Sequence, residues 1–149
     1  MANLPKDALA EYPVVLTVPV QWGDQDPFGH VNNTVYFRWF ESARIAYCLR
    51  VGLGDSDAGE KVAPILASIT CQFRRALTFP DIIRVGARVT RIGRTSMTME
   101  HAVVSDAQAA LAAEGTSVLV VLDYQQNRPH PVPDEIRRAI EQLEGKPFA

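Results

Sequence analysis

The sequence lacks the features that mark several classes of protein. Only two cysteines occur in 149 residues, Cys48 and Cys71, and they form no CxxC pair, so no cysteine-based zinc framework is present. No apolar run reaches the roughly 18 residues that a membrane-spanning helix needs. The net charge of −2 offers no basic excess for a nucleic acid. We therefore expect no nucleic-acid partner and no membrane span.

Common catalytic motifs are missing as well. The stretch GDSDAG at 54–59 has the wrong spacing for the Gly-x-Ser-x-Gly elbow of serine hydrolases. The three histidines, His30, His101 and His130, match no metal-ligand spacing, so no metal is expected. No glycine-rich phosphate loop occurs.

The composition is that of an ordinary globular protein, with 47% apolar and 21% charged residues. The length predicts a single domain over residues 1–149, in which residues 1–11 form an N-terminal arm. The first residues carry acids and prolines where a signal peptide would have a basic start and an apolar core. These features predict a cytoplasmic protein whose two cysteines are reduced.

The hydrophobic pattern predicts strands, a long helix and more strands. Alternation over 14–22 indicates a first strand, and a Gly/Asp/Asn-rich loop at 24–33 leads into a mostly buried helix of about 17 residues. We expect Asn33 or Thr34 to cap that helix and Gly52 to follow its end. After a loop at 53–61 come four strand-like runs joined by short hairpins and a final helix that opens at Pro133; the runs are 65–73, 83–90, 97–103 and 116–124. The predicted fold class is α+β, with one helix against an antiparallel sheet.

The stretch WGDQDPFGHVNN at 22–33, followed by YFRWFE at 36–41, is the most informative part of the chain. It sets two carboxylates, a glycine turn and a histidine directly before the first turn of a buried helix. Free N–H groups and a positive dipole end occur at that point, and together they can hold an oxyanion. A nearby carboxylate could attack a thioester carbonyl or activate a water molecule.

The pattern aromatic-Gly-Asp-x-Asp-x-x-Gly-His-Val-Asn-Asn, followed by Tyr-x-x-Trp-x-Glu, resembles the 4-hydroxybenzoyl-CoA thioesterase-like branch of the hotdog superfamily. The resemblance implies a curved five-stranded antiparallel sheet wrapped around one long central helix, with a short C-terminal helix. It implies an acyl-CoA thioester hydrolase that releases free CoA and a carboxylic acid and has no cofactor besides the CoA of its substrate. It also implies a homodimer, paired again into a homotetramer, with the site between subunits.

The resemblance assigns roles within the loop. Asp26 matches the catalytic carboxylate, as nucleophile or general base, and the backbone N–H of Asn33 matches the oxyanion donor. Gly29 allows the tight turn, and His30 fixes the loop or helps to bind the thioester. Asp24 is expected to be structural.

For the CoA moiety, the resemblance points to the segment around Gly93. Arg91, Arg94, Thr95 and Ser96 are the expected CoA contacts, because arginine pairs with phosphate oxygens in bidentate fashion. The alternative is that these arginines belong to a solvated strand face.

Other interpretations remain open. The Asp-x-Asp loop could be turn chemistry alone, and Glu41 on the helix is a second candidate for the catalytic carboxylate. The chain could act on acyl-carrier-protein thioesters, or bind acyl-CoA without turnover. A hotdog hydratase is a further alternative, although position 26 lacks the asparagine of its usual Asp-x-Asn-x-x-His arrangement. The sequence leaves the preferred acyl group open.

Overall fold

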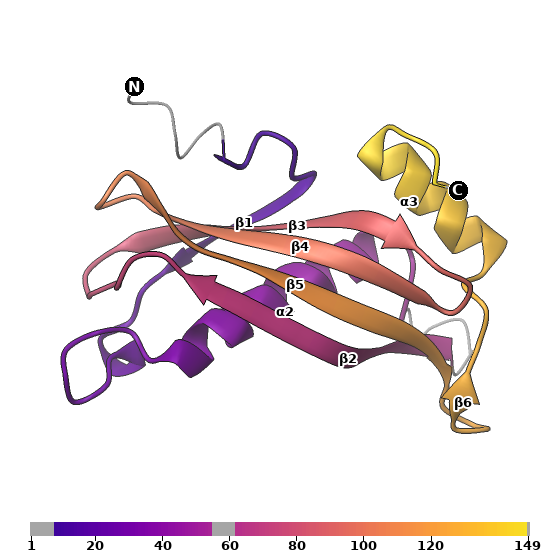
Figure 1. The fold of residues 1–149 in the computed structure, drawn as a ribbon, viewed down its shortest axis with the longest axis horizontal. Coiled ribbons are helices and arrows are strands. Elements are labelled where there is room, and N and C mark those ends of the chain that lie inside the picture. Colours follow the sequence, from indigo (N-terminus) through magenta and orange to yellow (C-terminus); the bar gives the residue numbers. More distant parts are fainter. Residues whose placement is uncertain (1–7, 55–61, 149) are drawn as a thin grey trace.

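The computed structural model describes residues 8–54 and 62–148. Most of the expected N-terminal arm (1–11) and of the expected loop at 53–61 lies outside the described residues. The elements, shown in Figure 1, are β1 (Val14–Pro19), the 3-10 turn η1 (Trp22–Asp24), α2 (Asn33–Arg50), β2 (Val62–Phe73), β3 (Ile82–Ile92), β4 (Ser96–Ser105), β5 (Ala110–Asp123), β6 (Arg128–Pro129) and α3 (Asp134–Glu144).

All strand pairs are antiparallel, in the order β1-β3-β4-β5-β2 with β6 added to β5. The prediction of one helix against an antiparallel sheet is confirmed, and the hairpins β3–β4 and β4–β5 are as expected. The sheet has six strands rather than five because the two-residue β6, which is too short for an alternating pattern, also pairs. Pro19 lies on the edge strand β1, where a missing N–H is tolerated.

The expectation of a hairpin between β2 and β3 is wrong. β2 pairs with β5 at the far edge of the sheet, and residues 74–81 cross about 14 Å of sheet, three strand spacings, to reach β3. The buried Leu77 anchors this crossing segment in the core. The connection between β2 and β3 is short, but the two strands that it joins are not neighbours in the sheet.

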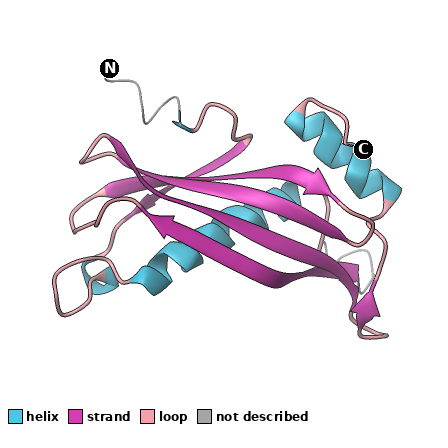
Figure 2. Ribbon diagram, viewed as in Figure 1, coloured by secondary structure: helices cyan, strands magenta, loops and turns pink. Residues whose placement is uncertain are grey.

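The helix α2 lies across one face of the sheet, and α3 packs at the end of the sheet where β3 finishes (Figure 2). The core face of α2 includes Trp39, Phe40 and Tyr47, each at most 4% exposed. The expectation that α2 is buried on most sides is wrong, because Ile45 and Leu49 are 52% and 60% exposed. One apolar side of α2 is thus open in the single chain.

A chain of buried hydrogen bonds ties α2 to three strands. Arg44 Nη1 donates to Ser117 Oγ at 3.2 Å, Ser117 Oγ lies 2.8 Å from His101 Nε2, and His101 Nδ1 lies 3.1 Å from the Gly86 carbonyl oxygen. A carbonyl only accepts, so Nδ1 carries the proton and Nε2 accepts from the serine hydroxyl. The His101 ring also stacks on Phe40, with ring centroids 4.8 Å apart.

Burial lowers the pKa of His101 to about 4, the Gly86 carbonyl opposes this shift, and Arg44 reinforces it. In the unfolded chain this imidazole titrates near its ordinary value of about 6.5. Between these two pH values the unfolded state binds the extra proton, so stability should fall as the pH drops from about 6.5 to about 4, by up to about 3 kcal/mol, and then level off. Urea unfolding across this range would measure the slope.

His101→Gln should lose this part of the pH dependence, whereas His130→Gln should keep it. An unchanged slope in His101→Gln would show that other groups cause it.

Candidate active site

The loop between β1 and α2 is fastened to the crossing segment 74–81. Val20 donates its N–H to the Asp81 carbonyl at 2.8 Å, and Val31 donates to the Leu77 carbonyl at 2.8 Å. Phe79 N–H donates to the side chain of Gln25 at 3.0 Å. The candidate site is therefore held by the segment that joins β2 to β3.

Within the loop, residues 26–30 form a tight turn. Asp26 N–H donates to the His30 carbonyl at 2.8 Å, and Gly29 N–H donates to the Asp26 carbonyl at 3.0 Å. Gly29 has φ of +84°, a conformation that a Cβ would strain. Phe28 at the tip is 87% exposed.

The Asp26 carboxylate takes part in this turn. Its Oδ1 accepts from the Phe28 N–H at 2.8 Å and, weakly, from the His30 N–H at 3.4 Å. Its Oδ2 accepts no hydrogen bond from the described residues. The turn chemistry expected of such a loop is thus present on one oxygen, and the other is left for a substrate or a water molecule.

Asp24 has the structural role that the sequence predicts. Its Oδ2 accepts from the Gln21 N–H at 2.8 Å, and its carbonyl accepts from the Asn32 N–H at 2.9 Å. These bonds close η1 and bring the chain to the start of α2.

The cap of α2 lies one residue earlier than expected. The N-cap is Asn32, not Asn33 or Thr34, and its Oδ1 accepts from the Thr34 N–H at 2.9 Å. Three capping residues stand in a row here, so composition could not choose among them. Asn33 becomes the first helical residue, and among the described residues its N–H has no acceptor.

A groove of about 240 Å³ lies beside this helix start. His30 and Asn33 line it from the loop side, and it is completed by Val31, Tyr36 and residues 73–76. Asp26 stands next to it in the loop but is not among its lining residues. Tyr36 packs edge-on against Phe73, with ring centroids 5.0 Å apart.

Sequence reasoning missed Arg74 and Arg75, which also line the groove. Both N–H groups bond to the Ala112 carbonyl, and the Arg74 guanidinium pairs with Glu114 at 3.1 Å. The sequence around Arg74 and Arg75 does not predict a place in the site, because they reach the loop only where the segment 74–81 crosses from β2 to β3.

The expected CoA contacts lie elsewhere. Arg91, Arg94, Thr95 and Ser96 are at the β3–β4 hairpin, at the opposite end of the sheet from the Asp26 loop (Figure 1). β3 has 11 residues, which corresponds to about 36 Å of strand. A single chain therefore does not bring the two predicted parts of the site together.

Residues 20–140 match the family model of the thioesterase-like superfamily. The chain belongs to this superfamily. The prediction of a thioester hydrolase is confirmed at the level of the family.

Solved structures agree with this membership. A thioesterase from Thermus thermophilus, complexed with coenzyme A and zinc, is 37% identical with a TM-score of 0.82 over 93% of this chain and 98% of that one. A putative thioesterase from Pseudomonas aeruginosa, the PA2801 protein, is 32% identical with a TM-score of 0.76 over 87% and 98% of the two chains. These similarities confirm the hotdog fold.

Among curated proteins, the long-chain acyl-CoA thioesterase FadM of Escherichia coli is 21% identical over 123 residues, 79% of this chain and 89% of FadM. The uncharacterized protein YsmA of Bacillus subtilis is 26% identical over 84 residues, 56% of each chain, so the match spans little more than half of that relative.

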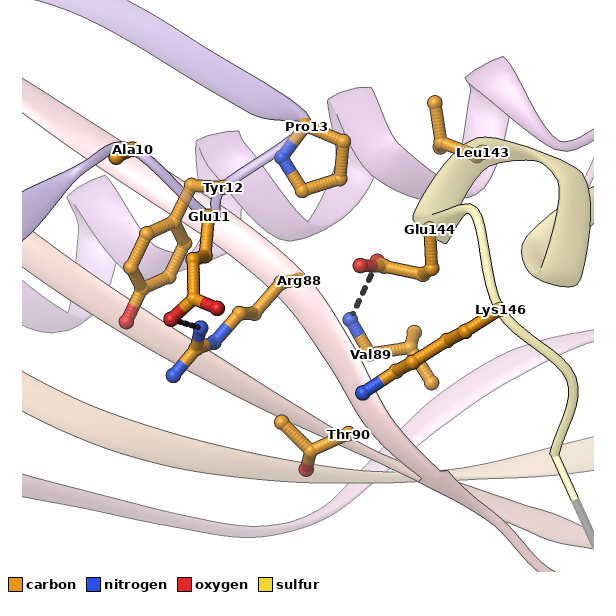
Figure 3. A pocket seen from close by; sticks show the side chains of 10 residues that line it. All are labelled: Ala10, Glu11, Tyr12, Pro13, Arg88, Val89, Thr90, Leu143, Glu144 and Lys146. Atoms are coloured by element: carbon orange, nitrogen blue, oxygen red, sulfur yellow. Dashed lines mark hydrogen bonds and ion pairs between the residues drawn. The ribbon is translucent and has the colours of Figure 1, made fainter.

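This thioesterase-like chain has a second groove, of about 440 Å³, between the residues before β1 and the end of α3 (Figure 3). Its lining is polar. Three of its charged side chains, Glu11, Arg88 and Glu144, already have bonding partners. Arg88 bonds to Glu11 at 3.2 Å and to Glu100 at 2.6 Å, and Glu144 accepts from the Val89 N–H at 2.9 Å. We therefore assign it a structural role, which is to hold α3 and the N-terminal residues to β3.

No group of three or more side chains able to hold a metal occurs within residues 8–54 and 62–148. None of the helices described there is long and apolar enough to cross a membrane.

The cap assignment can be tested with neighbouring asparagines. Asn32→Ala should destabilise the protein by about 1 kcal/mol, because the Thr34 N–H loses its acceptor. Asn33→Ala, at an exposed position, should change stability by less than about 0.5 kcal/mol. If chemical denaturation shows that both variants lower the free energy of unfolding equally, the assignment of Asn32 as the N-cap is wrong.

Proposed function

We propose that the chain hydrolyses acyl-CoA thioesters in the groove at the start of α2. The observation that carries this proposal is the Asn33 N–H, which has no acceptor among the described residues and lies at the positive end of an 18-residue helix. The loop beside it presents a carboxylate. The thioesterase-like family, the CoA-complexed relative and FadM support the choice of substrate class.

The chemistry needs two groups from this chain. The thioester carbonyl oxygen accepts a hydrogen bond from the Asn33 N–H, which stabilises the oxyanion as the carbonyl carbon is attacked. Asp26 either takes the proton of the attacking water or attacks the carbon itself, and in the latter case water then hydrolyses the resulting anhydride. The C–S bond breaks, CoA leaves as its thiolate and takes up a proton, and the carboxylic acid is released.

The remaining loop residues have supporting roles in this proposal. Gly29 allows the turn that presents Asp26, and His30 borders the groove where the thioester would lie. Glu41 is exposed on α2 and lines a different groove, so it is the less favoured carboxylate.

We propose further that the CoA phosphates bind Arg91, Arg94, Thr95 and Ser96 of a second copy of the chain. A twofold axis through the middle of β2 would pair the two β2 edges antiparallel. Because opposite ends of the two sheets then lie side by side, the hairpin of one copy would stand at the same end as the Asp26 loop of the other.

The exposed edge of β2 favours this homodimer. The strand has 12 residues and no charged side chain, and Ile65, Leu66 and Phe73 are 44%, 39% and 50% exposed. An exposed, uncharged and apolar edge of this length is a template for another strand. The homotetramer and the cytoplasmic location stay predictions.

Replacement of Asp26 tests the chemistry. With a panel of short, long, branched and aromatic acyl-CoAs, Asp26→Asn should lower kcat for CoA release at least about 100-fold, which corresponds to about 2.7 kcal/mol of barrier. Glu41→Gln should retain activity, and circular dichroism should show both variants folded.

If Glu41→Gln loses activity and Asp26→Asn retains it, Glu41 is the catalytic carboxylate. If the wild type cleaves no CoA ester but cleaves acyl-carrier-protein thioesters, the substrate proposal is wrong. If it releases no thiol from either, the hydratase and binding-module alternatives replace it.

Charges placed on the two edge strands test the dimer. Ser68→Lys with Thr70→Lys on β2 should convert a dimer into a monomer at micromolar concentration, because lysine on an edge opposes strand pairing. Thr17→Lys on the other edge strand, β1, should leave the dimer intact. Light scattering after size exclusion measures both, and a monomeric wild type would refute the proposal.

A further inference from the structure

The turn formed by residues 106–109, between β4 and β5, contacts the crossing segment 74–81. Gln108 is exposed on this turn, and its Nε2 donates to the Ala76 carbonyl at 2.8 Å. Ala76 is one of the residues that line the groove at the start of α2. A side chain that lies 32 positions further along the sequence therefore holds one wall of the candidate active site.

Asp81 ties the other end of the crossing segment to the same turn. Its Oδ1 accepts from the Ala107 N–H at 2.9 Å and from the Ile82 N–H at 2.7 Å, and its Oδ2 accepts from Ser105 Oγ. Ser105 is fully buried, and its hydroxyl oxygen in turn accepts from the Gln108 N–H at 3.0 Å. A carboxylate carries a charge, so its hydrogen bonds are stronger than those between neutral groups. Both ends of the crossing segment are thus fixed to one turn.

Between these two ties, the crossing segment carries the loop that precedes α2. Its Leu77 carbonyl accepts from the Val31 N–H, and its Phe79 N–H donates to the Gln25 side chain. The two contacts lie on either side of Asp26 in the sequence. A displacement of the crossing segment would therefore move the Asp26 carboxylate.

We propose that Gln108 and Asp81 are positioning residues for the hydrolysis, which act through the crossing segment and set the place of Asp26 relative to the Asn33 N–H. This inference rests on the proposed function. Neither Gln108 nor Asp81 lines the groove. The reaction needs the carboxylate and the N–H group at one thioester carbonyl, and a misplacement of about 1 Å, even from a change far from the chemistry, can cost about 100-fold in rate.

Substitution of Gln108 tests the proposal, because this side chain is exposed and its replacement leaves the core intact. Gln108→Glu replaces the donor by a carboxylate of nearly the same shape, which repels the Ala76 carbonyl. We expect kcat for CoA release to fall about ten-fold, because the hydrogen bond is lost. KM should change by less than about two-fold, because the proposed phosphate contacts lie at the β3–β4 hairpin.

Three further variants separate positioning from stability. Gln108→Lys keeps a donor for the Ala76 carbonyl and should retain at least about half of the wild-type kcat. Gln142→Glu makes the same chemical change as Gln108→Glu at an exposed position on α3 and should alter neither kcat nor KM. Asp81→Asn weakens the second tie and should give the same split between kcat and KM, with thermal unfolding showing that the variant is folded.

Amide hydrogen exchange gives a readout besides activity. The Val31 and Phe79 N–H groups should exchange faster in Gln108→Glu than in the wild type, because the crossing segment that holds them is loosened. In Gln108→Lys and in Gln142→Glu both groups should exchange as in the wild type. Equal exchange in Gln108→Glu and the wild type would overturn the proposal.

The activity data distinguish this proposal from the proposed function. If Asp26→Asn is inactive while Gln108→Glu keeps the kcat of the wild type, the proposed function stands and the positioning role is wrong. If Gln108→Lys loses as much activity as Gln108→Glu, the hydrogen bond to Ala76 is not the cause, and the positioning role is again wrong. A wild type that releases no thiol would overturn the proposed function, and the positioning role with it.

Discussion

The close packing of α2 onto the middle of the sheet is the constraint on which the rest of the structure depends. A Cβ at Gly115 on β5 would overlap both the Phe40 ring and the carbonyl oxygen of Thr70 on β2. The absence of that single atom lets the helix lie directly against the strand. The hydrogen-bond chain from Arg44 through Ser117 and His101 then fixes its rotation about its own axis.

The position of α2 decides where the chemistry can be. Its N-terminus ends beside the crossing segment 74–81, which holds the Asp26 loop through Leu77 and Phe79. The same rotation that buries Tyr47 and Phe40 leaves Ile45 and Leu49 exposed and turns Arg44 inward. A helix with an uneven apolar surface thus serves both as core and as the wall of a groove.

The sequence predicted where helices and strands lie along the chain better than it predicted which strands pair with one another. Period-two alternation found β3 and β4, because one face of each is buried, and Pro133 marked the start of α3. The start of β5 was missed because Ala110–Gly115 consists mostly of alanine and glycine, with little alternation. The sheet order was missed because a connection of eight residues is long enough either for a loose hairpin or for a crossing.

The same contrast holds for the candidate site. The motif at 22–33 located the loop, the glycine turn and the helix start, since these are local and depend on residue type. Arg74 and Arg75 come from a distant segment, and no pattern of their own places them at the groove. The exposed Ile45 and Leu49 lie on a helix that the sequence predicted to be mostly buried, because hydrophobicity alone does not show which face of a helix will be covered.

The crossing between β2 and β3 also bears on how the chain folds. β3, β4 and β5 are joined by short turns, so their contacts are local and cost little loop-closure entropy. β2 must find β5 across the intervening hairpins, with Val62 opposite Asp123, and pairing at such separation is slow. We therefore expect the β3–β4–β5 meander to form early, and β2 and the groove beside the Asp26 loop to be completed late.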